Sequence, residues 1–370
     1  MGGISTGDAG RFLLAAVSHR FGDERGAAHL SLLSGRIPPR DMDGLVDNAI
    51  YHELEPLLHL VSTDCSGSGH PLDLPPELPA RWSLIHAREM ARAAIIHYGA
   101  AKALGTLSDA GVRVIPLKGF YLASRLYEKR GARGFKDLDL LVEPASLVDL
   151  NETLLAAGFL PAPERPSFVP APAYTVYSLP MEGSDTAMEI DIHIGMHWPE
   201  EYERRTRFTA ADLWARAAPE EVEGMRLWAL SPEHLVITTL LDAAVNHRYA
   251  RLVKFRDVLE ILRGAEVDWG EVDEWCRRWG VRSFVGPGLR FLSQLDEGAV
   301  PADTPGSILP SYAAMRLFGR VLLLSALPDH RSRSFSLPNL LFFYLADTPR
   351  QRARGLMYVP RHVLRGRHRF

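Results

Sequence analysis

The sequence has few cysteines, no long hydrophobic run and no strong excess of charge of either sign. Its 370 residues include two cysteines, Cys65 and Cys276, which lie far apart. Two cysteines cannot make a disulfide framework or a cysteine-based metal site, and they suit a reducing compartment. The formal net charge of −3 gives no general reason to expect nucleic acid as a partner.

Apolar stretches are present, but each is short. The run at residues 12–17 lacks a basic start and makes a poor signal peptide. Two later stretches, at 321–328 and 337–346, contain proline and are too short to span a bilayer. We therefore expect a cytoplasmic protein with no membrane span.

Hydrophobic periodicity places helical regions on both sides of a segment of mixed character. Apolar side chains recur at helical spacing through residues 9–63 and 79–110, with a Gly-, Ser- and Pro-rich connection at 64–79. Helical patterns return from Ser231 onward. They continue through 252–263, 270–280 and 311–325. The predicted parts are an N-terminal helical region (1–110), an α/β core (111–200), a C-terminal helical region (201–349) and a basic tail (350–370).

The core has the pattern β-α-β-α-β-β. Strands are predicted at 112–117, 137–142, 174–179 and 187–194, and helices at 119–127 and 144–158. The proline-dense stretch 160–173 is expected to be an irregular loop, and residues 182–185 a hairpin turn. We therefore predict an α+β fold, in which a small mixed β-sheet is flanked by N-terminal and C-terminal helical regions.

Two carboxylates stand at the beginning of the second predicted strand. Asp137 and Asp139 are two residues apart, and strand residues at that spacing project to the same face. The apolar run that ends at Val142 is a setting that charges avoid unless they are paired or bound. Two hard oxygen ligands at a fixed spacing suit Mg²⁺ or Mn²⁺. By itself, such a pair is also compatible with two solvated acids at a strand edge.

A third acid lies on a later predicted strand. Glu189, Asp191 and His193 alternate with apolar residues, so that one strand face is apolar and the other carries acids and an imidazole. Phosphoryl transfer often uses two metal ions about 3.5–4 Å apart, and we prefer Asp191 to Glu189 as the third carboxylate ligand. His193 and His197 have a spacing that favours zinc only on a helix, and Pro199 argues against a helix there.

These motifs together resemble the DNA polymerase β nucleotidyltransferase superfamily, and within it the uncharacterised bacterial group called nucleotidyltransferase family proteins. The matching residues are Leu117-Lys118-Gly119, Arg133, Asp137-Leu138-Asp139-Leu140-Leu141-Val142 and Asp191-Ile192-His193. The later stretch that carries Arg251 and Asp257 also resembles that group. The resemblance spans roughly residues 80–265.

The resemblance implies a reaction class. Superfamily members hold two Mg²⁺ ions with three strand carboxylates and transfer a nucleoside monophosphate from an NTP to an acceptor hydroxyl, releasing pyrophosphate. It implies that Asp137 and Asp139 are metal ligands that bridge to the triphosphate. Asp191 would lower the pKa of the acceptor hydroxyl through its metal, or act as its base. The expected acceptor is a small molecule or a peptide or protein hydroxyl. An inactive or regulatory member that binds nucleotide or a partner, and a metal-dependent phosphohydrolase, stay open as alternatives.

The start of the intervening helix departs from the superfamily pattern. Typical members have a Gly-Ser pair there, whereas this chain has Lys118-Gly119. A lysine ammonium and the amides of a helix N-terminus both attract phosphate, so we expect Lys118 and Gly119 to bind phosphate. Arg130 and Lys136 are further cationic candidates near the phosphates.

Three residues of the motif have alternative uses. Arg133 is expected either to contact phosphate or to form an ion pair that orients Asp137. His193 is expected to position a carboxylate rather than contact the substrate. Arg251 and Asp257 are expected to make structural contacts between domains.

The C-terminal tail is strongly basic. Residues 350–370 contain seven arginines, two histidines and no acids. We expect the apolar residues among them to pack and the charges to remain solvated. Contact with nucleic acid through phosphate neutralisation stays open as the alternative.

Overall fold

The computed structural model describes residues 7–161, 174–180, 187–195, 206–247, 249–302 and 304–306. Four predicted features lie outside the described residues, in whole or in large part. They are residues 162–173 of the loop predicted at 160–173, the hairpin turn at 182–185, the helix at 311–325 and the basic tail at 350–370. His197 also lies outside them.

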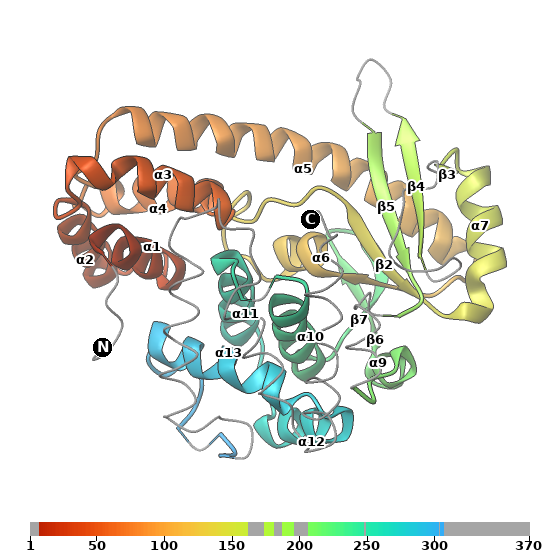
Figure 1. Cartoon of the computed structure of the whole chain (residues 1–370). Helices are drawn as coiled ribbons and strands as arrows, with labels where there is room; N and C mark the ends of the chain where they lie inside the picture. The colour runs from red at the N-terminus through yellow and green to blue at the C-terminus, as the bar shows by residue number, and fades with distance from the viewer. Residues whose placement is uncertain are drawn as a thin grey trace, which may run out of the picture.

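The N-terminal part consists of helices, as the periodicity predicted. They are α1 (Asp8–Ser18), α2 (Glu24–Ser34), the 3₁₀-helix η1 (Pro39–Asp41), α3 (Met42–Tyr51), α4 (Glu55–Gly67) and α5 (Glu77–Asp109). Helix α5 is one unbroken helix of 33 residues that runs along the top of Figure 1. Gly111 follows it with φ +74°, the left-handed conformation that a glycine after a helix supplies. The connection before α5 is shorter than predicted, because α4 continues to Gly67 and buries Cys65.

The core follows the predicted order of strands and helices except for one additional short strand, β3, which occupies the first two residues of the predicted loop at 160–173. It contains β1 (Val114–Leu117), α6 (Lys118–Arg125), β2 (Leu138–Val142), η2 (Pro144–Ser146), α7 (Leu147–Ala156), β3 (Leu160–Pro161), β4 (Tyr174–Pro180) and β5 (Ala187–His193). The strands form one mixed sheet in the order β1-β2-β5-β4-β3. Strands β2 and β5 are parallel, and the other neighbouring pairs are antiparallel. The prediction of a small mixed sheet is confirmed.

Helix α5 covers the sheet at close range. A Cβ atom on Gly99 of α5 would lie 2.8 Å from the Cγ atom of Met188 on β5, so only glycine allows this approach. All five residues of β2 are buried, which explains its continuous apolar character. Asp139 of β2 therefore lies in a strand that is enclosed by protein, rather than at a solvated edge.

The C-terminal part is mainly helical but contains a two-stranded hairpin after its first helix. Its elements are α9 (Ala210–Arg216), β6 (Ala218–Val222), β7 (Met225–Ala229), α10 (Pro232–Val245), α11 (Leu252–Gly264), α12 (Trp269–Trp279) and α13 (Arg282–Leu295). Helix α10 starts as predicted, because the Ser231 side chain accepts a hydrogen bond from the His234 amide. The β6–β7 hairpin was not predicted, although Glu223 and Gly224, both at positive φ, form its turn.

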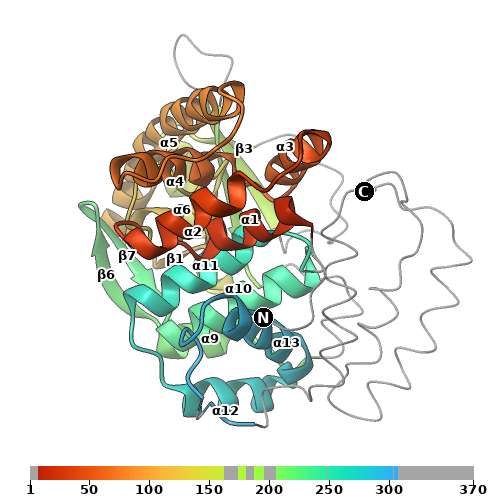
Figure 2. The same ribbon diagram turned by 90° about the vertical axis from the view of Figure 1, so that its left-hand side faces the viewer.

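The N-terminal and C-terminal helices pack against each other. Figure 2 shows α1 and α11 next to each other at the centre of the molecule. Arg256 of α11 is 1% exposed and donates to the carbonyl oxygens of Val17 and His19 at the end of α1, at 2.9 and 2.6 Å. These bonds satisfy carbonyls that the end of a helix leaves without a partner. Within the described part of the chain, no helix combines the length and apolar character needed to cross a membrane.

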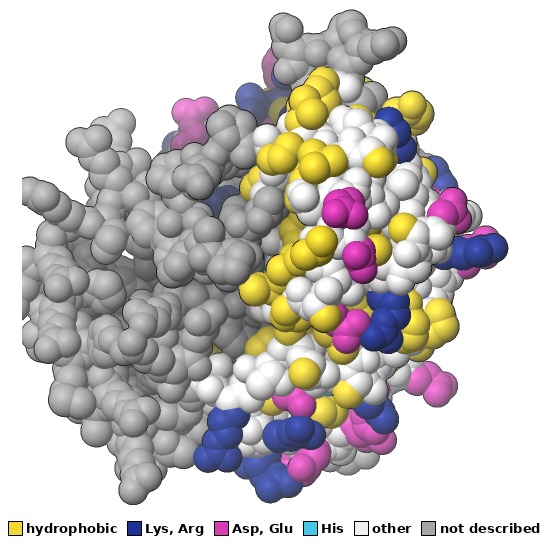
Figure 3. Space-filling model, turned by 90° about the vertical axis from the view of Figure 1, so that its right-hand side faces the viewer, with side chains coloured by type: hydrophobic (Ala, Val, Ile, Leu, Met, Phe, Trp, Pro, Cys, Tyr) yellow, Lys and Arg dark blue, Asp and Glu magenta, His cyan; other side chains and the backbone are white. Residues whose placement is uncertain are grey.

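The face that carries α7 and β3 exposes several apolar side chains (Figure 3). Val148 is 67% exposed, Leu155 42% and Leu160 53%. Exposed hydrophobic residues are common on folded proteins, and by themselves these do not identify a partner.

Candidate functional site

The register of two parallel strands brings the predicted acids together. Asp139 of β2 lies opposite Asp191 of β5, and His193 lies two residues further along β5. Ligand atoms of Asp139, Asp191 and His193 all lie within 4.8 Å of one another. Two carboxylates and an imidazole are a donor set that fits a divalent cation. The chain therefore places a suitable set of ligands at one point of the sheet.

Asp139 is the most tightly held of these residues. Its side chain is 9% exposed. Its Oδ1 atom accepts a hydrogen bond from Lys118 Nζ at 3.1 Å and lies 2.7 Å from His193 Nε2. Burial would raise the pKa of Asp139, but the charge of Lys118 and the bond to His193 outweigh burial and lower it to about 2. Asp139 is thus ionised at neutral pH. His193 contacts this carboxylate, as expected of a positioning residue.

Asp137 lies near this group but outside it. The strand begins at Leu138, one residue later than predicted, so Asp137 immediately precedes β2. Asp137 is partly buried. Burial raises its pKa to about 6, with further contributions from the charges of Asp139 and Asp191. The three predicted carboxylates are therefore close enough to repel one another in the absence of a bound cation.

Lys118 faces these acids from the start of α6. It is the first residue of the helix and follows β1 directly, with φ +55°, a conformation that residues other than glycine rarely adopt. Burial opposes the charge on its ammonium group, but the carboxylates of Asp139 and Asp242 outweigh burial and raise the pKa of Lys118. The predicted cation is therefore present and charged.

Gly119 has a packing role in addition to its predicted one. A Cβ atom at this position would lie 3.0 Å from the Cβ atom of Phe135, which precedes the Asp137 region in the chain. Phe135 in turn packs edge-on against Phe120 of α6, with ring centroids 5.8 Å apart. Glycine at 119 therefore lets the connection between α6 and β2 approach the beginning of the helix.

Arg133 does not form the predicted ion pair with Asp137. It binds Asp257 of α11 instead, with Nε 2.9 Å from Oδ1 and Nη2 3.3 Å from Oδ2. Tyr127 donates to the same Oδ1 atom at 2.7 Å. Arg133 is 7% exposed and Asp257 1%, so the guanidinium group is used inside the protein rather than presented to a phosphate. Arg133 and Asp257 thus connect the core to the C-terminal helices.

Arg130 and Arg251 also have partners away from the acids, and the remaining cationic candidate, Lys136, is exposed. Arg130 lies 2.7 Å from Glu223 in the β6–β7 turn. Arg251 lies 3.9 Å from Glu53 and 4.5 Å from the centre of the Tyr51 ring. Asp257 makes the expected contact between regions, with Arg133 of the core. Arg251 also makes a contact between regions, with the N-terminal helices.

A second charged pair faces Lys118 and was missed by the sequence analysis. Asp242 of α10 and Lys254 of α11 form an ion pair at 2.7 Å, and both are buried. A narrow cleft lies between this pair and Lys118, with the side chains of Thr238 and Thr239 in its lining. Burial would raise the pKa of Asp242, but Lys254 and Lys118 outweigh burial and lower it. The signal in the sequence is a lone acid in an otherwise apolar stretch of α10.

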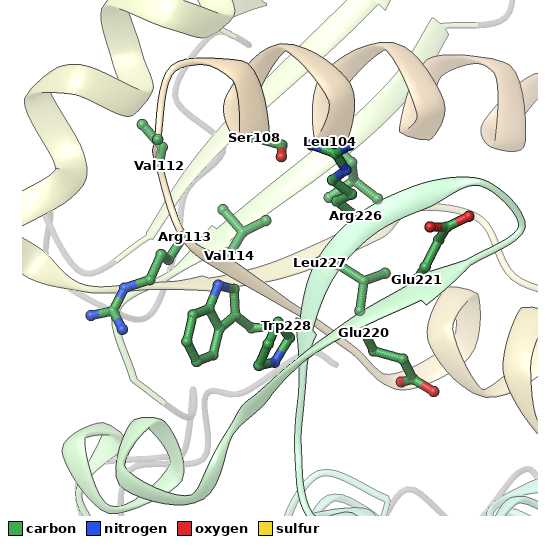
Figure 4. Close-up of a pocket in the computed structure, with 12 residues that line it drawn as sticks. Leu104, Ser108, Val112, Arg113, Val114, Glu220, Glu221, Arg226, Leu227 and Trp228 are labelled. Atoms are coloured by element: carbon green, nitrogen blue, oxygen red, sulfur yellow. The ribbon is translucent and has the colours of Figure 1, made fainter.

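A larger cavity lies elsewhere, between the end of α5, the start of β1 and the β6–β7 hairpin (Figure 4). Its volume is about 440 Å³, and its lining includes Arg113, Arg226 and Trp228. None of the acids of the sheet lines it. We place the candidate site at the acids, because the chemistry of the side chains, rather than cavity size, identifies it.

Solved structures similar to this chain include the following two proteins, both at low sequence identity. One is an antigenic nucleotidyltransferase-like protein from Paracoccidioides brasiliensis, with a TM-score of 0.40 and 14% identity, covering 60% of this chain and 96% of that protein. The other is JHP933 from Helicobacter pylori, with a TM-score of 0.29 and 12% identity, covering 75% of this chain and 97% of that protein. No curated protein matches the chain.

A family model gives the clearer result. The model described as "Uncharacterised nucleotidyltransferase" matches residues 38–295, which is more than half of the chain. The matched range contains the sheet with its acids, the Lys118 helix and the helices that carry Asp242, Lys254 and Asp257. The chain therefore belongs to this nucleotidyltransferase family, and the resemblance of its motifs to that group is confirmed.

Proposed function

We propose that the protein is a metal-dependent nucleotidyltransferase that moves a nucleoside monophosphate from an NTP to a hydroxyl of a small molecule, peptide or protein. The observation that carries this proposal is the convergence of Asp139, Asp191 and His193 within 4.8 Å, with Lys118 against the same carboxylate. Family membership supports the reaction class. Mg²⁺ or Mn²⁺ would be held by Asp139 and Asp191, with Asp137 close by, and would supply charge stabilisation at the transferring phosphate.

In the reaction, the acceptor oxygen forms a bond to the α-phosphorus while the bond from that phosphorus to the α,β-bridging oxygen breaks. The nucleoside monophosphate is thereby joined to the acceptor, and pyrophosphate leaves with the electron pair of the broken bond. The acceptor proton passes to a base, for which Asp191 is the proposed residue. Glu189, on the same strand face as Asp191, is the weaker candidate for the third carboxylate ligand.

The cations of the chain have separate proposed roles. Lys118, together with the amide of Gly119 and the N-terminus of α6, would attract the triphosphate. Arg133 is not proposed as a phosphate ligand, because Asp257 occupies its guanidinium group inside the protein. His193, whose Nε2 atom lies 2.7 Å from Asp139 Oδ1, would either fix the orientation of Asp139 or join it as a ligand of the cation.

The test supplies each of the four NTPs, labelled at the α-phosphate, with Mg²⁺ and mixtures of hydroxyl acceptors. We expect a labelled acceptor and an equal amount of pyrophosphate. Asp139→Asn should reduce both by about 100-fold or more, because it removes an anionic ligand. Asp149→Asn, in an exposed acid of α7, is the matched control and should leave both unchanged.

Other outcomes would identify the alternatives. Orthophosphate released in place of pyrophosphate would identify a phosphohydrolase. Stabilisation of the folded protein by an NTP with no turnover would identify a regulatory nucleotide-binding member. Turnover that persists at the wild-type rate in Asp139→Asn would refute the assignment of the site.

A further inference from the structure

Lys118 and His193 both contact a single oxygen atom of the acidic cluster. Oδ1 of Asp139 lies 3.1 Å from Lys118 Nζ and 2.7 Å from His193 Nε2. In a two-ion centre, the ions lie about 3.5–4 Å apart and share carboxylate ligands. The Lys118 ammonium group carries a full positive charge at neutral pH. It lies within hydrogen-bonding distance of Asp139, the carboxylate that two such ions would share.

The backbone directs Lys118 to this place. Leu117, the residue before it, pairs with Asp139 in the β1–β2 ladder, so the chain leaves the sheet beside the carboxylate. Lys118 then adopts φ +55°, which costs a residue with a side chain about 1 kcal/mol and is typical of functional sites. A glycine would adopt this conformation without strain. Because Glu223 adopts the same conformation in an ordinary turn, the role of the ammonium group is inferred from its contact with Asp139.

The number of ligand atoms that lie close together suits one ion. Asp139, Asp191 and His193 form the group of three whose ligand atoms are mutually close, and Asp137 is not a member of it. One divalent ion and one ammonium group carry three positive charges. The side chains of Asp137, Asp139 and Asp191 carry three negative charges when all are ionised. Before nucleotide binds, the charges therefore balance without a second ion.

We propose that the site holds a single divalent ion on Asp139, Asp191 and His193, and that the ammonium group of Lys118 takes the place of the second ion. This inference rests on the proposed nucleotidyltransferase function. The cleft between Lys118 and the Asp242–Lys254 pair borders the ammonium group on its other side. Lys118 thus contacts the carboxylate cluster and also lines that cleft, and it would contact the triphosphate of a bound nucleotide from its place beside Asp139.

The test counts bound Mn²⁺ by equilibrium dialysis and records its electron paramagnetic resonance spectrum. The probes are Mn²⁺ alone and Mn²⁺ with inorganic tripolyphosphate, the group common to all NTPs. Two Mn²⁺ ions about 4 Å apart are magnetically coupled, whereas a single ion gives an uncoupled spectrum. The wild-type protein should bind one uncoupled ion at the site with either probe.

Removing the ammonium group should create a place for a second ion. We expect Lys118→Met to bind two Mn²⁺ ions with tripolyphosphate and to show a coupled spectrum. Lys118→Gly provides a second neutral variant, free of the backbone strain, should the methionine variant fail to fold. Lys118→Arg keeps the positive charge and should bind one ion. Lys129→Met, at a surface lysine that pairs with Glu128, is the control and should behave as wild type.

The outcomes separate this inference from the proposed function. A coupled pair in the wild-type protein would overturn the role of Lys118 while leaving nucleotidyl transfer intact. A single ion in both neutral variants would also overturn it. If the wild-type protein binds no Mn²⁺ and transfers no nucleotide, the proposed function itself fails.

Discussion

Replacing Asp137 with asparagine should stabilise the metal-free protein at neutral pH, although the residue belongs to the candidate site. In the folded protein, burial and the charges of Asp139 and Asp191 raise the pKa of Asp137 from 3.8 to about 6. Each pKa unit corresponds to about 1.4 kcal/mol, so a shift of about two units gives about 3 kcal/mol at most. Because Asp137 is partly exposed, solvent screening reduces the expected gain to about 2 kcal/mol.

The sign of the effect follows from proton linkage. The folded state of the wild-type protein binds the Asp137 proton more tightly than the unfolded state, so the stability of the folded state falls as pH rises from about 4 to about 6. Below this window Asp137 is protonated in both states, and the variant should have no advantage. Above it Asp137 is ionised in both states, and the variant should have its full advantage.

The measurement is urea unfolding of wild type and Asp137→Asn at several values between about pH 4 and about pH 8, with a chelator present. The difference in unfolding free energy should grow through the window and then stay constant. Asp149→Asn, in an exposed acid, should show no comparable change. A variant that is less stable than wild type at neutral pH would show that Asp137 makes a favourable interaction in its ionised form, which would refute this reasoning.

Two other substitutions test the packing that supports the site. Asp257→Ala leaves Arg133 buried without its partner and should lower the unfolding free energy, measured in urea, by about 3–5 kcal/mol. The double variant with Arg133→Met should lose less free energy than the two single variants together. Additive losses would refute the coupling. Gly119→Ala places a methyl group 3.0 Å from the Cβ atom of Phe135 and should cost about 1 kcal/mol or more by thermal unfolding. An unchanged melting temperature would show that the connection containing Phe135 can move aside.

Local sequence patterns predicted the elements that carry the acids, because strand and helix periodicity are local properties. The alternation of Glu189, Asp191 and His193 with apolar residues was enough to predict β5 and its polar face. The parallel pairing that places Asp139 opposite Asp191 is consistent with that prediction. Confirmation of the family and of the mixed sheet means that the framework of the site was available from the sequence.

Long-range partners could not be predicted in the same way. Arg133 and Asp257 are 124 positions apart in the chain, and nothing in either local sequence identifies the other. The sequence therefore left Arg133 with two candidate partners, a phosphate or Asp137, and the structure pairs it with Asp257 instead. The contact of Asp242 and Lys254 with the cleft was missed for a related reason, because the packing of α10 and α11 against the core decides which face of each helix is buried.

The conformation of Lys118 involves both local backbone preference and long-range contacts. Backbone propensity alone favours glycine at a position with positive φ, so the sequence pattern gives no reason to expect the lysine there to begin α6. The sheet fixes the separation of Asp139 and Asp191 through backbone pairing, which does not depend on any bound cation. The Lys118 ammonium group, in contrast, lies at the end of a flexible side chain. The carboxylates are therefore preorganised, and under the single-ion proposal the number of ions they hold depends on whether Lys118 stays in contact with Asp139.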